Sequence, residues 1–459
     1  MLKTRMYPRA VLLSLAAILL AACQDREVLL PGPRLDIRTP VAEGQDFDPS
    51  RAAAIDRQSD LIAVGSLAGQ PTQIALPSPR VNAAWTHAGG TPTQRISHPA
   101  LTPVTGRVWV TEIGEGESRR NRITTRPVTD GARIYTLDAG ATVQATTTAG
   151  QRVWAVDLTP SGDSSDEASG GGLATANGRV YVTSVFGTLS ALDAATGALI
   201  WQQDLGAAAV GAPTVSQGTV YLVARDNQAW ALDEETGRIR WQLTGLPSTS
   251  GFAGGSSVAV DNRIAVFPYS SGEVIATFRQ GGLRLWGGAV QGERLGQAYA
   301  RIGDISAGPV IDGSRVFAGN ASGRLVALDA ADGRRQWTAE VGAYEPVWPV
   351  GGSLFAVTDR GALVRINAQT GETIWRYQLP YFEDIRQRRR EAVVSHHGPV
   401  LAGGLLYVAS GDGVLRMFDP VSGQLQRQIP LPGGAAAAPI VAGGTLYVVT
   451  TDGKLHAFR

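Results

Sequence analysis

The chain has 459 residues, of which 44% are hydrophobic and 18% are charged, and its mean hydropathy is −0.02. These values describe a folded globular body and exclude both a disordered chain and a membrane protein with many spans. Lys and Arg number 41 and Asp and Glu number 40, so no net positive field attracts nucleic acid. A single cysteine, Cys23, excludes disulfide scaffolds and cysteine-rich metal sites.

The first 23 residues have the form of a bacterial secretion leader. Three basic residues precede an apolar stretch, residues 10–20, which is too short to span a hydrocarbon core about 30 Å thick. Small residues come directly before Cys23, as in a lipobox, so we expect residues 1–22 to be removed and Cys23 to be lipidated. The alternative is an ordinary leader that happens to contain a cysteine. Because Gln24 rather than Asp follows Cys23, we expect an anchor in the outer membrane that faces the periplasm.

Residues 23–75 have the composition of a flexible tether. They are rich in proline and contain few periodic apolar residues. A coil of about 50 residues has an average span on the order of 40 Å. The folded domain, which we expect over residues 76–459, therefore hangs clear of the lipid surface and can meet partners in the periplasm.

One supersecondary unit recurs along the rest of the chain. Residues 178–205, GRVYVTSVFGTLSALDAATGALIWQQDL, match residues 218–243, GTVYLVARDNQAWALDEETGRIRWQL. Further copies begin at Gly313, Gly352, Gly404 and Gly444, and weaker copies begin at Arg133 and Gly272. With Asp193 as marker, the copies fall at positions 138, 193, 233, 278, 329, 367, 419 and 459. This spacing is typical of the blades of a β-propeller.

Each copy contains alternating strands, a Thr-Gly turn and a strand with Trp, which predicts a four-stranded antiparallel blade. A Pro-x-Val segment before most copies, as at Pro213 and Pro309, is expected to be the innermost strand. The fold class is therefore all-β, an eight-bladed β-propeller. The last copy ends at Arg459 before its Trp strand, so we expect an N-terminal strand near Trp85 to close the ring.

The most regular residues of the repeat are predicted to be structural. The turn carboxylate, as in Asp193, accepts backbone N–H bonds, and the following glycine, as in Gly197, supplies a positive φ. Trp201 and its equivalents are expected to fill the wedge between neighbouring blades. Phe278 replaces the turn Asp and Arg427 replaces the Trp, so these two blades depart from the pattern.

The unit G-x-V-Y-V-x4-G-x-L-x-A-L-D-x-x-T-G-x3-W resembles the pyrroloquinoline-quinone-type propeller repeat. Together with the lipobox and the tether, the chain resembles the BamB-type lipoproteins of the outer-membrane barrel-assembly machinery. This resemblance implies a non-catalytic scaffold that docks a POTRA domain of the central barrel protein and assists the folding and insertion of outer-membrane proteins. Unfolded outer-membrane protein clients are a further possible partner, and nucleic acid is not expected to be one.

The alternative function is that of a periplasmic quinone-dependent dehydrogenase. Such enzymes are usually larger, hold Ca²⁺ near the quinone and often carry a vicinal cysteine pair. This chain has one cysteine, and no HExxH, GxSxG or phosphate-binding GxxxxGK[ST] motif is present. We therefore expect no enzymatic activity, no cofactor and no metal.

The resemblance also implies where the partner binds. The family pattern of Arg, an apolar residue and Asp before a blade's first strand is matched by Arg301, Ile302 and Asp304. A second acidic residue of the family falls on Ser306. Without the family resemblance, Asp304 fits two roles equally well: a residue of a partner-binding site, or a turn carboxylate that accepts bonds from neighbouring N–H groups.

A second loop, residues 248–255, aligns with the family's partner loop, in which Phe252 is the expected apolar anchor and the family's Arg is missing. Phe252 lies among Gly and Ser, so it either presents its ring to a partner or tucks into the rim of a blade. The basic stretch at residues 381–390 is either a solvated surface loop or a site for a second partner or lipid headgroups.

Overall fold

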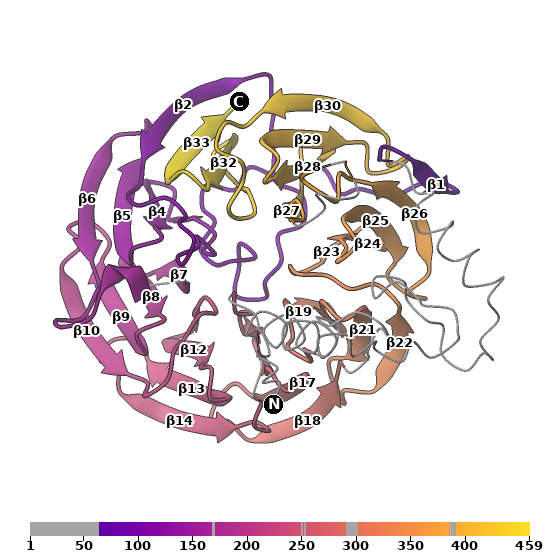
Figure 1. The fold of residues 1–459 in the computed structure, drawn as a ribbon. Coiled ribbons are helices and arrows are strands. Elements are labelled where there is room, and N and C mark those ends of the chain that lie inside the picture. Colours follow the sequence, from indigo (N-terminus) through magenta and orange to yellow (C-terminus); the bar gives the residue numbers. More distant parts are fainter. Residues whose placement is uncertain are drawn as a thin grey trace, which may run out of the picture.

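Eight antiparallel sheets are arranged around a common axis, each with its strands ordered outward from the axis (Figure 1). This arrangement confirms the eight-bladed β-propeller. No helix in the described part of the chain is long and apolar enough to cross a membrane. The computed structural model describes residues 64–459 apart from residues 168–169, 249–250, 252–253, 291–301, 385 and 387–391.

The first four blades follow the chain from the innermost strand to the outermost. Alternate residues of each strand face the two neighbouring blades, which explains the alternating pattern of the repeat. Their strands are β3 (Val128–Thr129), β4 (Arg133–Leu137), β5 (Thr142–Thr147) and β6 (Arg152–Asp157); β7 (Gly171–Ala176), β8 (Arg179–Ser184), β9 (Thr188–Asp193) and β10 (Leu199–Asp204); β11 (Thr214–Ser216), β12 (Thr219–Val223), β13 (Gln228–Asp233) and β14 (Ile239–Thr244); and β15 (Ala259–Val260), β16 (Ile264–Pro268), β17 (Glu273–Phe278) and β18 (Arg284–Ala289).

Blades five to eight are built in the same way, with two additions from the N-terminal part of the chain. β1 (Leu67–Gly69) extends blade six, and β2 (Arg107–Glu112) completes blade eight. The remaining strands are β19 (Ala307–Asp312), β20 (Arg315–Asn320), β21 (Arg324–Asp329) and β22 (Arg335–Ala339); β23 (Trp348–Val350), β24 (Ser353–Val357), β25 (Ala362–Asn367) and β26 (Thr373–Gln378); β27 (His396–Ala402), β28 (Leu405–Ser410), β29 (Val414–Phe418) and β30 (Leu425–Pro430); and β31 (Ile440–Ala442), β32 (Thr445–Thr450) and β33 (Lys454–Phe458).

The ring is closed by an N-terminal strand, as expected, but not by the one at Trp85. β2 pairs with β33 along its whole length, from Arg107 opposite Phe458 to Glu112 opposite Lys454. The assignment to Trp85 was wrong because Trp109 is the tryptophan that the last copy lacks. The Trp109 indole N–H donates to Thr148 O at 3.1 Å, across the junction with blade one.

The recurring tryptophans pack between blades, which confirms their structural role. A Cβ on Gly237 would lie 2.6 Å from the Trp201 ring, so only glycine fits in the turn beneath it. The Trp201 indole N–H also donates to Glu234 O at 3.2 Å. In blade seven Arg427 stands at the position of the Trp and makes a comparable hydrogen bond, since its Nη1 donates to Val104 O at 3.1 Å. The replacement of Trp by Arg therefore keeps the hydrogen bond that ties one blade to the next.

The turn chemistry is also confirmed, with one error in the alignment of the first copy. Asp193 Oδ1 accepts backbone N–H bonds from residues 195 and 196, and Gly197 has a φ of 77°. Asp138, however, follows β4 rather than β5, so the marker assigned to blade one is one hairpin too early. The cause is that the segment around Asp138 has the same Leu-Asp-Ala letters as the true turn of blade two.

Residues 80–101 form an axial plug, a loop whose ends pair through Arg80 N with His98 O and Ala100 N with Arg80 O. Figure 1 shows the N-terminal part of the chain crossing the centre of the ring. The axial plug makes at least one hydrogen bond to the innermost strand of every blade, or to the turn that follows that strand. Its partners in blades one to eight are Thr129, Thr175, Val215, Val260, Ile311, Trp348, Gly403 and Gly443.

Residues 64–79 form a strap that runs over blades six and seven. β1 pairs with β26, Ile74 and Leu76 pack against the core, and the buried Arg365 donates to Thr72 O and Gln73 O. Part of the segment that we expected to be a tether is therefore held against the propeller.

Burial lowers the pKa of three histidines, His87, His396 and His456, to about 4. Their pKa in the unfolded chain is about 6.5, so the unfolded state takes up protons first as the pH falls. We expect the free energy of unfolding to be constant above pH 6.5 and to decrease between pH 6.5 and 4. The decrease at pH 5 is about 2 kcal/mol for each histidine. Urea unfolding at pH 7 and pH 5 measures it, and the His87→Gln variant should show a smaller difference between the two.

Candidate partner-docking cleft

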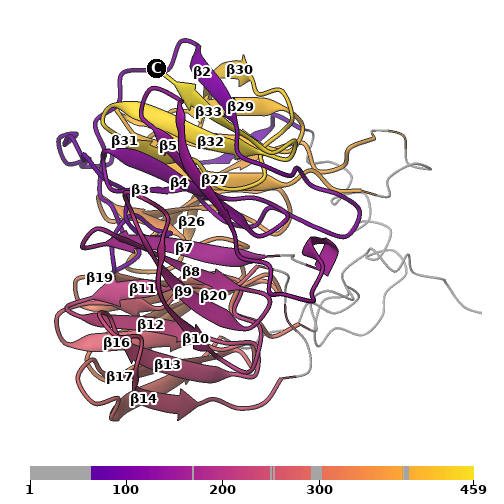
Figure 2. The ribbon, with the colours of Figure 1, turned by 90° about the vertical axis from the view of Figure 1, so that its left-hand side faces the viewer.

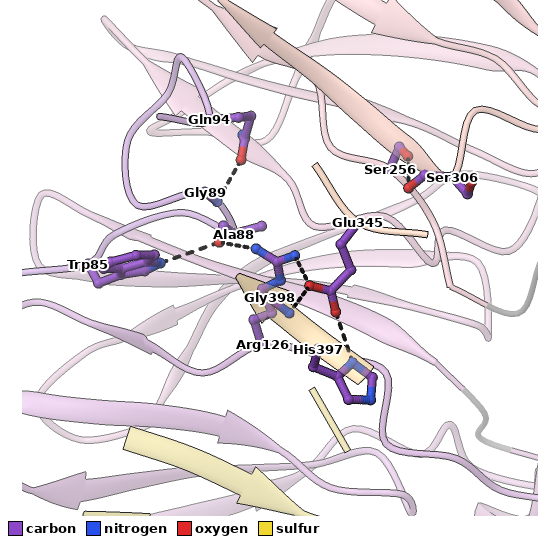
Figure 3. Close-up of polar contacts among 10 residues, drawn as sticks. All are labelled: Trp85, Ala88, Gly89, Gln94, Arg126, Ser256, Ser306, Glu345, His397 and Gly398. Atoms are coloured by element: carbon purple, nitrogen blue, oxygen red, sulfur yellow. Dashed lines mark hydrogen bonds and ion pairs between the residues drawn. The ribbon is translucent and has the colours of Figure 1, made fainter. Parts of the chain in front are cut away.

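The connections that lead from each blade to the next emerge on one face. Two kinds of connection lie at the same end of each sheet, because neighbouring strands are antiparallel. One is the turn between the second and third strands of a blade. The other is the link from the outermost strand to the next blade. We call this end the loop face. In Figure 2 it is on the right-hand side, where the short helix η1 (Ser165–Glu167) projects. The axial plug bonds at the opposite end, where the innermost strands finish. It also reaches toward the loop face, where Arg126 donates to Ala88 O at 3.2 Å (Figure 3).

A small open cleft lies on the loop face, where the connections of blades three, four and five meet. Its walls come from five connections, two of them turns within blades and three of them links between blades. The lining residues are Val210, Gly211, Val223, Ala224, Arg225, Asn227, Gly254, Gly255, Ser256, Pro268, Ser270 and Asp304.

Asn227 joins the two turns that form one wall of the cleft. It has a φ of 60°, a conformation that Asn tolerates better than most residues. Its amide Nδ2 donates to Leu246 O, while Oδ1 accepts bonds from the backbone N–H of Ser270 at 3.0 Å and from its hydroxyl at 2.7 Å. Both donor and acceptor of a buried amide are thus used, which holds the turns of blades three and four in a fixed relation.

The opposite wall is made of backbone that approaches backbone closely. Gly211 and Gly255 form a parallel bridge, and a Cβ on Gly211 would collide with Ser256 O. Ser256 in turn donates its hydroxyl to Ile305 O and, at 3.1 Å, to Ser306 O (Figure 3). The link that precedes blade five is therefore fastened to the link that precedes blade four.

Two opposite charges converge on Gly251, at the mouth of the cleft. A Cβ on Gly251 would collide with Nη1 of Arg225 and would lie 3.0 Å from Oδ2 of Asp304. Arg225 comes from the turn between β12 and β13, and Asp304 comes from the link between β18 and β19. The structure thus brings Asp304 to the loop that contains position 252, although the two are far apart in the sequence.

Of the other residues predicted for the site, the structure describes Ile302 and Ser306. Ile302 lies beside this region and its carbonyl accepts a bond from the Ser322 hydroxyl at 2.7 Å. Ser306 donates its hydroxyl to Ala343 O at 2.7 Å, so it ties the link to blade six. Phe252, Arg301 and Cys23 lie outside the described residues.

Sequence reasoning missed Arg225 and Asn227. Both lie in a hairpin turn of the repeat, RDNQ at residues 225–228, where the polar letters look like ordinary turn residues. A comparison of the copies offers one signal, because the equivalent turn of blade two has Val185 in place of Arg225 and Gly187 in place of Asn227.

A second polar cluster spans the axis near the loop face (Figure 3). Glu345 accepts bonds from Arg126 at 2.9 Å, His397 Nδ1 at 2.8 Å and Gly398 N at 2.8 Å. Burial raises the pKa of Glu345, but the Arg126 charge and these hydrogen bonds outweigh it, so the pKa is lower than usual. Since Arg126 precedes blade one and Glu345 precedes blade six, this ion pair braces the ring from side to side.

None of these side chains forms a recognisable metal site. No group of three or more His, Cys, Asp or Glu residues is close enough to hold a metal within the described part of the chain. His396, which neighbours His397, is occupied by the Ser410 hydroxyl at 2.7 Å and Pro380 O at 2.6 Å. Both imidazole rings therefore have structural partners.

The fold defines a class, the β-propellers that are built from PQQ-like repeats. A family model described as outer membrane protein assembly factor BamB matches residues 139–377 and 384–459, more than half of the chain. The chain belongs to the BamB family of outer membrane protein assembly factors.

Individual relatives agree with this assignment. The BamB of Salmonella typhimurium strain LT2 is 32% identical over 340 residues, which cover 72% of this chain and 81% of the relative. The BamB of Escherichia coli K12 is 30% identical over 333 residues, with the same coverage of both chains.

Solved structures show the same fold. The crystal structure of BamB from Moraxella catarrhalis has a TM-score of 0.62 at 18% identity and covers 77% of this chain and 99% of its own. The quinohemoprotein alcohol dehydrogenase from Comamonas testosteroni also has a TM-score of 0.62, at 15% identity, and covers 82% of this chain and 80% of its own. Structural likeness alone therefore does not separate scaffold from enzyme, whereas the sequence relatives favour the assembly factor.

Proposed function

We propose that this protein is a non-catalytic scaffold of the outer-membrane barrel-assembly machinery, anchored by a lipid on Cys23 at the periplasmic face of the outer membrane. It docks a POTRA domain of the central barrel protein through the cleft on the loop face. Family membership supports the assembly role. The observation that carries the docking site is the convergence of Arg225 and Asp304 on Gly251.

The charges of the cleft suit a polar, specific contact. Opposite charges side by side orient a partner that carries the complementary pair and reject one with a single charge. Because Gly251 has no Cβ, both charged side chains can approach its backbone, and Phe252 follows directly in the sequence as the proposed apolar anchor. Arg225 supplies a positive charge at the loop in which the family's Arg is missing.

Charge reversal tests this assignment. We expect Asp304→Arg with Phe252→Ala, and separately Arg225→Glu, to lower recovery of the barrel protein from gently solubilised membranes about tenfold or more, because residues at the centre of an interface carry most of its binding energy. Quantitative mass spectrometry of the affinity-purified protein measures the recovery.

Glu235→Arg is the matched control, because Glu235 is exposed in a turn at the opposite end of blade three. This variant should recover the barrel protein as well as the unmodified chain does. Equal recovery with the cleft variants and with the control would remove the docking site from this cleft.

The alternative function, a quinone-dependent dehydrogenase, makes a different prediction. It requires stoichiometric binding of a quinone and substrate-dependent reduction of a dye. Its support is likeness of fold, and the vicinal cysteine pair common in such enzymes has no counterpart in a chain with one cysteine.

A further inference from the structure

The turn between the second and third strands of each blade contains a residue with a positive φ, between 60° and 96°. Six of these eight residues are glycines, because a Cβ makes this conformation unfavourable. The residues are Ala141, Gly187, Asn227, Gly272, Gly323, Gly361, Gly413 and Gly453. Blade three is thus the one that keeps a side chain longer than a methyl group at a position where the repeat uses glycine.

A side chain at this position faces the link that leaves its own blade. In blades two, four and seven, a Cβ on Gly187, Gly272 or Gly413 would lie 2.9–3.4 Å from a carbonyl oxygen of that link. In blade three the link is residues 245–258, and the amide Nδ2 of Asn227 donates to Leu246 O. The asparagine thus turns a crowded contact into a hydrogen bond.

Asn227 also reaches the neighbouring blade, although it is almost completely buried, with 1% of its surface exposed. Its Oδ1 accepts bonds from the backbone N–H and the hydroxyl of Ser270, which lies in the equivalent turn of blade four. Its own carbonyl accepts a bond from Gly245 N at 2.8 Å. One residue therefore fastens three connections to one another, while almost none of it is open to a partner.

These three connections carry or border the proposed partner contacts. Arg225 stands two residues before Asn227 in the same turn, and a Cβ on Gly251, in the link that Asn227 holds, would collide with its Nη1. Ser270 and Asn227 both line the cleft. The relative position of Arg225 and the link therefore depends on the bonds that Asn227 makes.

We propose that Asn227 is a positioning residue of the cleft. Its side-chain bonds offset a strained backbone and hold the turn of Arg225, the link that follows blade three and the turn of blade four in the arrangement that the partner binds. A partner binds more tightly to a surface that is already ordered, because less conformational freedom is lost on binding. The proposal deepens the proposed function and rests on it for the identity of the partner.

Asn227→Gly in the full-length protein tests the proposal. We expect this variant to fold, because glycine occupies the same turn position in six other blades, and urea unfolding checks this. Its affinity for the purified barrel protein in detergent, measured by surface plasmon resonance, should fall about tenfold. Hydrogen exchange at the amide of Ser270, which loses its acceptor, should become faster. Ser270→Ala, which removes one of the three side-chain bonds of Asn227, should weaken binding about threefold.

Ala141→Gly is the matched control, because it relieves the same backbone strain in blade one, away from the cleft. It should bind the barrel protein as tightly as the unmodified chain does, and an equal loss of affinity in this control would overturn the proposal. If Arg225→Glu weakens binding and Asn227→Gly does not, or if Asn227→Gly weakens it without faster exchange at Ser270, the positioning role fails and the docking site stands. If neither variant weakens binding, or the unmodified chain does not bind, the proposed docking function and the positioning role fail together.

Discussion

Replacement of Trp85 by alanine is expected to lower the free energy of unfolding by about 3–5 kcal/mol. Trp85 is fully buried in the axial plug, where its ring stacks on Trp348 of blade six at 6.1 Å and its indole N–H donates to Ala88 O. Its backbone also pairs with Thr129 of blade one. The substitution leaves a cavity at the point where the plug joins two distant blades, and urea unfolding measures the loss.

Val81→Ala is the control, because Val81 belongs to the same plug but is 79% exposed. Its effect should stay within about 0.5 kcal/mol. A similarly small effect for Trp85→Ala would mean that the axial plug contributes little to the stability of the ring.

Replacement of Arg365 by leucine is expected to cost about 3 kcal/mol and to loosen the strap. The guanidinium is buried and donates to Ser353 Oγ, Thr72 O and Gln73 O, so its loss leaves carbonyls of the strap without a donor. Hydrogen exchange at the amides of Gly65 and Gln70, which pair with blade six, should become faster.

Arg238→Leu is the matched control, because it makes the same substitution at an arginine that is exposed in a turn of blade three. It should alter neither the stability nor the exchange of the two amides. If Arg365→Leu lowered stability without any change in that exchange, the buried arginine would support blade six alone and not the strap.

The sequence predicted the blades well because each repeat carries its own local signals. The turn carboxylate of Asp193, the positive φ of Gly197 and the ring of Trp201 are all explained by contacts within one blade or with the next. The axial plug escaped prediction because its contacts connect residues far apart in the chain, such as Asn82 and Val441. It has no periodicity, so nothing local distinguishes it from a loop.

The closing strand was missed for a different reason. Arg107 to Glu112 alternates around Trp109 as the other outermost strands do around their tryptophans, and this pattern was available in the sequence. The cleft was predicted only in part, since Asp304 came from family resemblance whereas Arg225 reaches it through the register of blade three. No property of a single turn indicates which loops of neighbouring blades will face each other.

The central claim is that this propeller is a scaffold of the barrel-assembly machinery. The most direct test is to solubilise native membranes gently, recover the protein by an affinity tag and identify what remains bound in roughly stoichiometric amounts. Our account predicts the central outer-membrane barrel protein. Recovery of a cytochrome or a tightly held quinone without that barrel protein would contradict the account and favour the dehydrogenase.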